Sequence, residues 1–373
     1  MLYFDNAATT MPSKLALEKA SKFNNQDFFN PSALYSGGLS CAREVKTAKE
    51  NILKNLCATG FELIFTSCGS ESDNMAIFCS VKRGAYLTDK GEHSAVYKSF
   101  LEHKNRGQTV YFAGLNKDGT VDVSQLIEIV KNNKIDFVSI VHVNNETGGI
   151  NDVNAIAKAV KSINKKIVFH VDGVQAYGKI PYKLSQDIDL YSISAHKINA
   201  LKGVGALIKK KELNVAPLIF GGGQENGYRS GTENVFGIKV FEYASLEKYK
   251  HLLDNYQKVK DLNNIFINGL DKELFTFISN ENCSPYILTV SARGLRGEII
   301  MHALESQGVI IGNGSACSSK NRFSRVIEAC GYDASVLDGV VRISFSPNNT
   351  EKECLDAVQI INETVKRLKG KLT

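Results

Sequence analysis

Short apolar segments alternate with amphipathic segments through the first two thirds of the chain. Apolar runs bounded by polar residues predict buried strands at residues 63–66, 85–87, 109–112, 137–143, 167–171, 187–191 and 204–208. Apolar residues at helical spacing predict helices at residues 72–81, 94–103, 123–131 and 153–162. Because strands joined by single helices form βαβ units, we expect an α/β domain built on a mostly parallel sheet.

The pattern changes towards both ends of the chain. The N-terminal part predicts a strand at residues 2–4 and helices at residues 13–23 and 38–56. Beyond residue 223, a helical pattern covers residues 235–270 and is followed by mixed elements at residues 286–290, 298–306, 340–345 and 351–368. We therefore expect two domains: a large one of residues 13–250, and a smaller α/β one of residues 1–12 and 251–373.

Composition narrows the class of protein. The net charge of +6, from 45 basic and 39 acidic residues, is too mild to indicate direct nucleic-acid binding. No pair among the eight cysteines has C-x-x-C spacing, and no metal site is predicted. The N-terminus has no signal-peptide pattern and no apolar run is long enough to cross a membrane, so we expect a cytoplasmic protein with reduced thiols.

Polar residues follow several of the predicted strands, where parallel sheets bind ligands. Gly69 and Ser70 lie between strand 63–66 and a helix, which suits a phosphate group, although an ordinary capped turn has the same composition. His93 begins the helix after strand 85–87 and offers a ring for stacking or proton transfer, unless it is simply exposed.

The later strands end in three further candidate residues. Asn145 can donate to a phenolate or a carboxylate, or can belong to an Asn-rich turn. Asp172 ends an apolar strand, where it either caps a helix or pairs with a cation such as a protonated pyridine nitrogen. Lys197 lies between strands 187–191 and 204–208, and is either a surface residue or a Schiff-base lysine. Together these residues are the parts that bound pyridoxal 5'-phosphate (PLP) requires.

The sequence resembles the PLP enzymes of fold type I in the class V aminotransferase group, and more closely the cysteine desulfurases. The resemblance lies in residues 4–10, 30–32, 65–74, 92–93, 142–148, 170–175, 194–197, 229–234 and 314–319. It implies a large domain with a mostly parallel seven-stranded sheet flanked by helices, and a small domain that contains the loop of a nucleophilic cysteine, Cys317. It also implies a homodimeric transferase that converts L-cysteine to L-alanine and passes the sulfur, as a persulfide on Cys317, to an acceptor protein.

The resemblance assigns a role to each cofactor-binding residue. Lys197 forms the Schiff base and acts in catalysis, and His93 stacks on the pyridine ring and helps to move protons. Asp172 pairs with the ring nitrogen, while Gln175 and Asn145 reach the phenolic oxygen. The phosphate ligands implied are Gly69, Ser70, Ser194, His196 and, from the neighbouring subunit, Thr232.

Substrate recognition and the fate of the sulfur follow from the same resemblance. Arg342, together with Asn145, is expected to bind the carboxylate of the substrate, for which a guanidinium is well suited. Cys68 stands where the family usually has a glycine. The alternatives to cysteine desulfurase activity are that the protein is a selenocysteine lyase, an aminotransferase, or a desulfurase homologue with altered catalysis. Iron–sulfur cluster biogenesis, tRNA thiolation and thiamine-type cofactor synthesis are all open as destinations of the sulfur.

Overall fold

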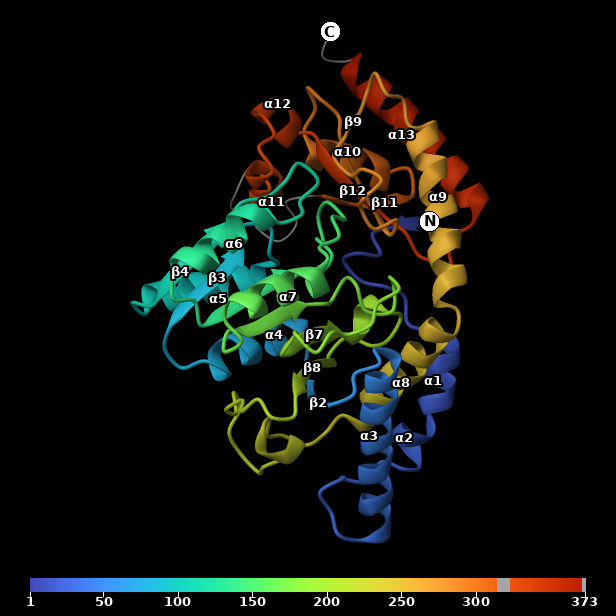
Figure 1. Ribbon diagram of the computed structural model, residues 1–373. Coiled ribbons are helices and arrows are strands. Elements are labelled where there is room, and N and C mark those ends of the chain that lie inside the picture. Colours follow the sequence, from blue (N-terminus) through green and yellow to red (C-terminus); the bar gives the residue numbers. More distant parts are fainter. Residues whose placement is uncertain (314–322, 371–373) are drawn as a thin grey trace.

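A computed structural model describes residues 1–313 and 323–370 of the protein (Figure 1). Its larger sheet has seven strands in the order β2-β8-β7-β6-β5-β3-β4. These strands are β2 (Phe61–Thr66), β8 (Gly205–Lys210), β7 (Leu190–Ser194), β6 (Val168–Asp172), β5 (Phe137–Val141), β3 (Ala85–Asp89) and β4 (Thr109–Ala113). Neighbours from β7 to β4 are parallel, whereas β8 is antiparallel to β2 and β7. The predicted mostly parallel, seven-stranded sheet is confirmed.

Both faces of this sheet are covered by helices, which explains why its strands are almost continuously apolar. In β2, Leu63 and Phe65 join one buried cluster, and Ile64 joins another on the opposite face. The first cluster includes residues of α3 (Ser36–Asn55), α6 (Val123–Asn132), α7 (Val153–Ile163) and α8 (Val235–Lys250). The second includes residues of α4 (Gly69–Cys79) and α5 (Ser94–Asn105).

A second sheet of five strands is formed mainly by the C-terminal part of the chain. Its order is β1-β11-β12-β10-β9, with β1 (Leu2–Phe4), β11 (Val309–Asn313), β12 (Val340–Ser344), β10 (Ile287–Ser291) and β9 (Thr276–Phe277). Its core also contains residues of α9 (Leu252–Gly269), α10 (Gly297–Glu305) and α13 (Glu351–Lys369). Figure 1 shows the N-terminal strand beside β11, to which it pairs in parallel. The domain boundaries at residues 12 and 250 stay a prediction.

Several predicted elements need correction. The helix predicted over residues 235–270 is two helices, α8 and α9, separated at His251, whose backbone is not helical. The apolar pattern does not reveal this break. Because α8 packs into the core of the large sheet and α9 into that of the small one, apolar residues recur both before and after His251. The helix predicted at residues 13–23 is likewise divided into α1 (Lys14–Ala20) and α2 (Lys22–Asn25).

The strand predicted at residues 187–191 lies three residues further on, as β7. The prediction stopped at the polar Ser192, whose hydroxyl instead hydrogen-bonds to His170 inside the sheet's interior at 2.9 Å. The strands β9 and β11 and the short helices α11 (Arg325–Ala329) and α12 (Ala334–Leu337) were not predicted. Within the described residues, no helix combines the length and apolarity needed to span a bilayer.

Candidate functional site

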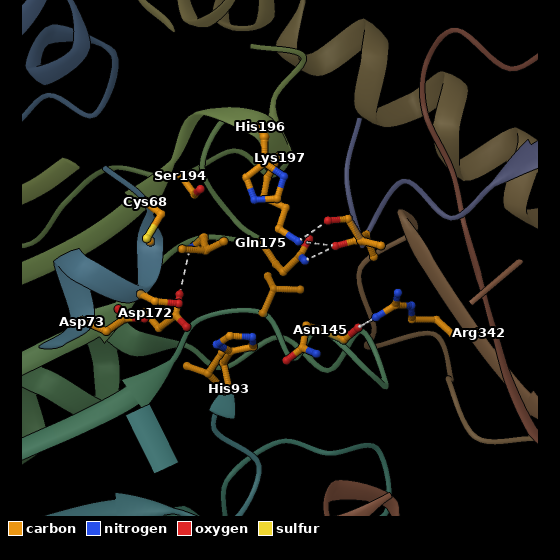
Figure 2. A pocket seen from close by; sticks show the side chains of 17 residues that line it. Cys68, Asp73, His93, Asn145, Asp172, Gln175, Ser194, His196, Lys197 and Arg342 are labelled. Carbon is orange, nitrogen blue, oxygen red and sulfur yellow. Dashed lines mark hydrogen bonds between the residues drawn. The ribbon is translucent and has the colours of Figure 1, made fainter. Parts of the chain in front are cut away.

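A cavity of about 400 Å³ opens where the large sheet meets the small one (Figure 2). Its wall contains side chains from the ends of β5, β6 and β7, from the starts of α4 and α5, and from β12. Ten of the predicted site residues line it: Gly69, Ser70, His93, Asn145, Asp172, Gln175, Ser194, His196, Lys197 and Arg342. The chain's topology therefore gathers residues that lie far apart in the sequence, such as Gly69 and Arg342.

One end of the cavity is suited to an anion. The helix α4 begins at Gly69, and the side chain of its N-cap residue, Cys68, forms no capping hydrogen bond in the described structure. A Cβ on Gly69 would lie 3.0 Å from Val174 Cγ2 and 3.3 Å from Ser194 Cβ, so a larger residue would crowd this wall. The Ser194 hydroxyl is buried, and no residue in the described part of the chain forms a hydrogen bond with it. An uncapped helix N-terminus beside an unsatisfied hydroxyl offers donors to a phosphate group.

Lys197 ends the 3₁₀ turn Ala195–Lys197 that directly follows β7. Its Nζ donates to the carbonyl oxygens of Ala7, at 2.6 Å, and Ala8, at 2.7 Å. Figure 2 shows the amine directed towards these two carbonyls of the N-terminal segment. The same residue that the sequence places after a strand therefore reaches into the cavity.

Asp172 and His93 lie together on another side of the cavity. Asp172 is 4% exposed, and its Oδ1 accepts a hydrogen bond from the backbone N–H of Val174 at 3.0 Å. Burial raises the pKa of Asp172, while His93 and Lys197 oppose that rise. His93 caps α5, because its Nδ1 accepts the N–H of Ala95 at 3.2 Å. Burial lowers the pKa of His93, so a neutral ring carries its proton on Nε2.

Arg342 links the two sheets at the cavity. It lies in β12, and its Nη1 donates to the carbonyl oxygen of Asn145 at 2.8 Å. Its Nη2 donates to Asp5 Oδ1, also at 2.8 Å, while its buried Nε has no hydrogen-bond partner among the described residues. The guanidinium is thus held in place and keeps a donor for an incoming carboxylate.

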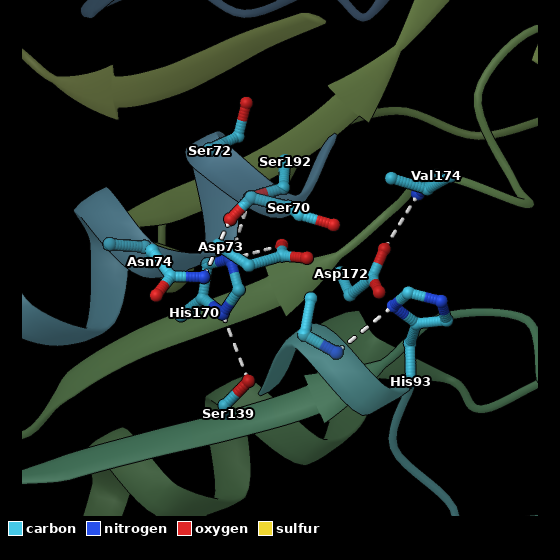
Figure 3. A network of polar contacts seen from close by, with 12 residues as sticks. Ser70, Ser72, Asp73, Asn74, His93, Ser139, His170, Asp172, Val174 and Ser192 are labelled. Atoms are coloured by element: carbon cyan, nitrogen blue, oxygen red, sulfur yellow. Dashed lines mark hydrogen bonds and ion pairs between the residues drawn. The ribbon is translucent and has the colours of Figure 1, made fainter. Parts of the chain in front are cut away.

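A buried polar network behind Asp172 was not predicted (Figure 3). Asp73 lines the cavity at 1% exposure, and its Oδ1 lies 3.7 Å from His170 Nε2 without a hydrogen bond. His170 contacts the hydroxyls of Ser139 and Ser192, both at 2.9 Å. Burial, and then Asp172, raise the pKa of Asp73. In the sequence, Asp73 sits within the first turns of a helix, where an acidic residue is ordinary, so its burial gives no signal there.

Acid is expected to destabilise the fold through His170. Burial lowers its pKa from 6.5 to about 3. The unfolded chain therefore binds more protons below pH 6.5, and the free energy of unfolding falls as the pH falls. Between pH 7 and pH 5, the drop should be about 2 kcal/mol smaller in His170→Asn than in the wild type.

Urea unfolding at the two pH values measures this difference. Comparison with the wild type is needed because buried carboxyls with raised pKa, such as Asp73 and Glu92, act in the opposite sense. His302→Asn, at an exposed position, is the control and should keep the wild-type drop. An equal drop in His170→Asn and the wild type would show that His170 is not held neutral.

Two predicted residues do not line this cavity. Thr232 lines a separate cavity of about 170 Å³, with Arg229 and Gly231. Cys317 lies outside the described residues. On the side preceding it, Gly312 of β11 pairs with Arg342, and on the side following it, Arg325 donates to the carbonyl oxygen of Glu92 at 2.5 Å. The described residues before and after this part of the chain thus contact Arg342 and the residue that precedes His93.

A family model for class-V aminotransferases matches residues 2–357. The chain belongs to this family. Within it, the chain is similar to the cysteine desulfurases: it is 32% identical to one from Nostoc sp. (strain PCC 7120 / SAG 25.82 / UTEX 2576), over 99% of this chain and 94% of that relative. The cysteine desulfurase IscS of Dictyoglomus turgidum is 34% identical, over 99% of this chain and 95% of its own length.

Solved structures of the family have the same fold. A NifS-like protein superposes with a TM-score of 0.91 at 31% identity, over 98% of this chain and 99% of that one. The structure of SspA in complex with cysteine superposes with a TM-score of 0.81 at 27% identity, over 94% of this chain and 100% of that one. The membership in the cysteine desulfurase family and the fold type I architecture predicted from the sequence are confirmed.

Proposed function

We propose that the protein is a PLP-dependent cysteine desulfurase. It converts L-cysteine to L-alanine and transfers the sulfur to Cys317, from which an acceptor protein takes it. The observation that supports this most directly is a single cavity in which Lys197, Asp172 and His93 lie around an uncapped helix N-terminus. The desulfurase relatives, which match nearly the whole chain, support the same activity.

The residues of the cavity fit PLP. The start of α4 and the Ser194 hydroxyl, which has no partner among the described residues, would hold the phosphate, with Ser70 and His196 beside them. The buried Asp172 carboxylate has a neutral backbone donor, which leaves its charge for the ring nitrogen. The ligand atoms of Asp73, His93 and Asp172 lie within 4.8 Å of one another, a grouping that a cationic ring would stabilise.

When bound, PLP would supply an electron sink for the reaction at the substrate's Cα. Lys197 Nζ leaves the carbonyls of Ala7 and Ala8 and moves the Cα proton. The Cys317 thiolate attacks the sulfur of the substrate. The S–S bond forms as the C–S bond breaks, and the electron pair of the C–S bond takes a proton at Cβ to give alanine. His93, neutral and with its proton on Nε2, is the further proton-transfer group at this wall.

Arg342→Lys is expected to raise the KM for L-cysteine by about 10-fold or more, with a smaller change in kcat. A lysine cannot hold Asn145 and Asp5 and also offer a third donor in a fixed plane. Initial rates over a range of cysteine concentrations measure both constants. Arg296→Lys, on an exposed residue of the small domain, is the control. An unchanged KM in Arg342→Lys would remove Arg342 from substrate binding.

The activity itself is tested by product analysis. The purified protein, reconstituted with PLP, is incubated with L-cysteine and a thiol reductant, and both sulfide and alanine are measured. Equal amounts of the two are expected. A keto acid without sulfide would favour an aminotransferase, activity on selenocysteine alone would favour a selenocysteine lyase, and absence of any product would indicate a catalytically altered homologue.

We also propose a homodimer, in which Thr232 of one copy completes the phosphate site of the other. This would account for Thr232 lying away from the Lys197 cavity within its own chain. For the sulfur, we propose delivery to an acceptor protein for iron–sulfur cluster biogenesis. Transfer towards tRNA thiolation or thiamine-type cofactors is the alternative. The cytoplasmic location stays a sequence-based prediction.

A further inference from the structure

A second buried lysine, Lys179, contacts the site from behind. Its Nζ donates to Gln175 Oε1 at 2.7 Å, and both side chains are 6% exposed. The other end of the same amide is also engaged, because Gln175 Nε2 donates to the carbonyl oxygen of Ala7 at 2.8 Å. A donor on one side and an acceptor on the other leave the amide a single favourable orientation.

The Ala7 carbonyl joins this pair to Lys197. It accepts from Gln175 Nε2 and also from Lys197 Nζ, at 2.6 Å, as Figure 2 shows. Three hydrogen bonds therefore connect Lys179 to the lysine that is proposed to hold PLP. Gln175 itself lines the cavity, and its amide nitrogen has a second N–H that Ala7 does not use.

The surroundings of Lys179 argue against a role as an ion pair. It lines a cavity of about 10 Å³ with Lys248 and Tyr286, and no carboxylate lines that cavity in the described part of the chain. Its Nζ lies 5.9 Å from the centre of the Tyr286 ring. Burial, followed by the charges of Lys197, Lys248 and Arg342, lowers the pKa of Lys179. Burying an amine in such a place costs free energy of folding. The hydrogen bond to Gln175 Oε1 is the side-chain interaction that offsets part of this cost.

We propose that Lys179 is a positioning residue, which fixes the amide of Gln175 so that its N–H₂ faces Ala7 and the phenolic oxygen of PLP. The inference rests on the proposed function, since it presumes PLP in the Lys197 cavity. With the amide reversed, Gln175 Oε1 would face the Ala7 carbonyl, and the donor for the phenolic oxygen would be lost. A donor at that oxygen stabilises its negative charge and so weakens its attraction for the proton on the Lys197 nitrogen.

Lys179→Met tests the proposal, because it keeps an unbranched side chain, one atom shorter than lysine, and removes the donor. We expect the affinity of the apoprotein for PLP to fall about 3- to 10-fold, the range for one hydrogen bond. The pH midpoint of the visible absorbance of the PLP-loaded protein should rise. Lys248→Met is the matched control: it removes a lysine of the same small cavity, and the hydrogen bonds of Gln175 among the described residues go to Ala7 and Lys179 rather than to Lys248. It should leave PLP affinity within about 2-fold of the wild type.

A double variant separates positioning from a general loss of charge. In a Gln175→Ala background, Lys179→Met should have no further effect on PLP affinity or on the pH midpoint. If Lys179→Met proves insoluble, Lys179→Gln takes its place. This variant keeps an N–H donor without the charge, and it should stay closer to the wild type than to Gln175→Ala.

Two results would overturn the proposal: equal effects of Lys179→Met and Lys248→Met, or an undiminished effect of Lys179→Met in the Gln175→Ala background. For Lys179→Gln, a change as large as that in Gln175→Ala would do the same. A wild-type protein that binds no PLP would instead contradict the proposed function, so the two failures are distinguishable.

Discussion

Lys197→Ala is expected to reduce the release of sulfide from L-cysteine by at least about 10³-fold, even with PLP in excess. The variant loses both the covalent link to the cofactor and the amine that moves the Cα proton. Among the described residues that line the cavity, Lys197 is the only lysine, so no second amine there can form the covalent link. The rate of sulfide release under saturating cysteine measures the loss.

Lys202→Ala is the matched control for that variant. Lys202 lies five residues further along the same connection between β7 and β8, but its side chain is exposed and does not line the cavity. Its replacement should leave the activity at the wild-type level. Desulfuration by Lys197→Ala at a rate close to that of the wild type would exclude Lys197 as the PLP anchor.

Cys317→Ser is expected to abolish the protein-bound persulfide and to reduce sulfide release by at least about 10³-fold, as when other enzymes lose a nucleophile. A serine hydroxyl is not ionised near neutral pH, so it cannot attack the substrate sulfur as a thiolate does. The absorbance of bound PLP should be unchanged, because Cys317 is not proposed to hold the cofactor. Persulfide labelling and sulfide release measure the two effects.

Cys57→Ser is the control, since Cys57 is an exposed cysteine. It should retain both the persulfide signal and the activity. A full persulfide signal in Cys317→Ser would assign the sulfur to another thiol. Cys68, which lines the cavity, would then be the first to replace.

Much of the large sheet could be predicted because its strands are buried on both faces and therefore form short, continuous apolar runs. The same pattern located the strand ends, and in a parallel sheet these converge at one edge. Asp172 and Lys197 could thus be placed at a common site from the sequence alone. The resemblance to the cysteine desulfurases then supplied roles for residues such as Arg342, which lies in the other sheet and has no local signal of its own.

The unpredicted features depend on contacts between distant segments. Asp73 and His170 are neighbours because α4 lies close to β6 in the fold. A sequence pattern does not reveal such a contact. In the sequence, nothing distinguishes Lys179 from an ordinary surface lysine. Only the structure shows that it is buried. The strand β11 was not predicted because its apolar run is short and ends before Gly312 and Asn313. In the structure, Gly312 nevertheless pairs directly with Arg342.

The fate of one substrate molecule per site is the most direct test of the whole account. The PLP-loaded protein is mixed with a limiting amount of L-cysteine without any reductant, and alanine and the sulfur bound to each cysteine-containing peptide are quantified by mass spectrometry. We predict equal amounts of alanine and of persulfide, with the extra sulfur on the peptide that contains Cys317. Alanine formed without a persulfide on Cys317, or a keto acid formed in place of alanine, would contradict the proposed desulfurase mechanism.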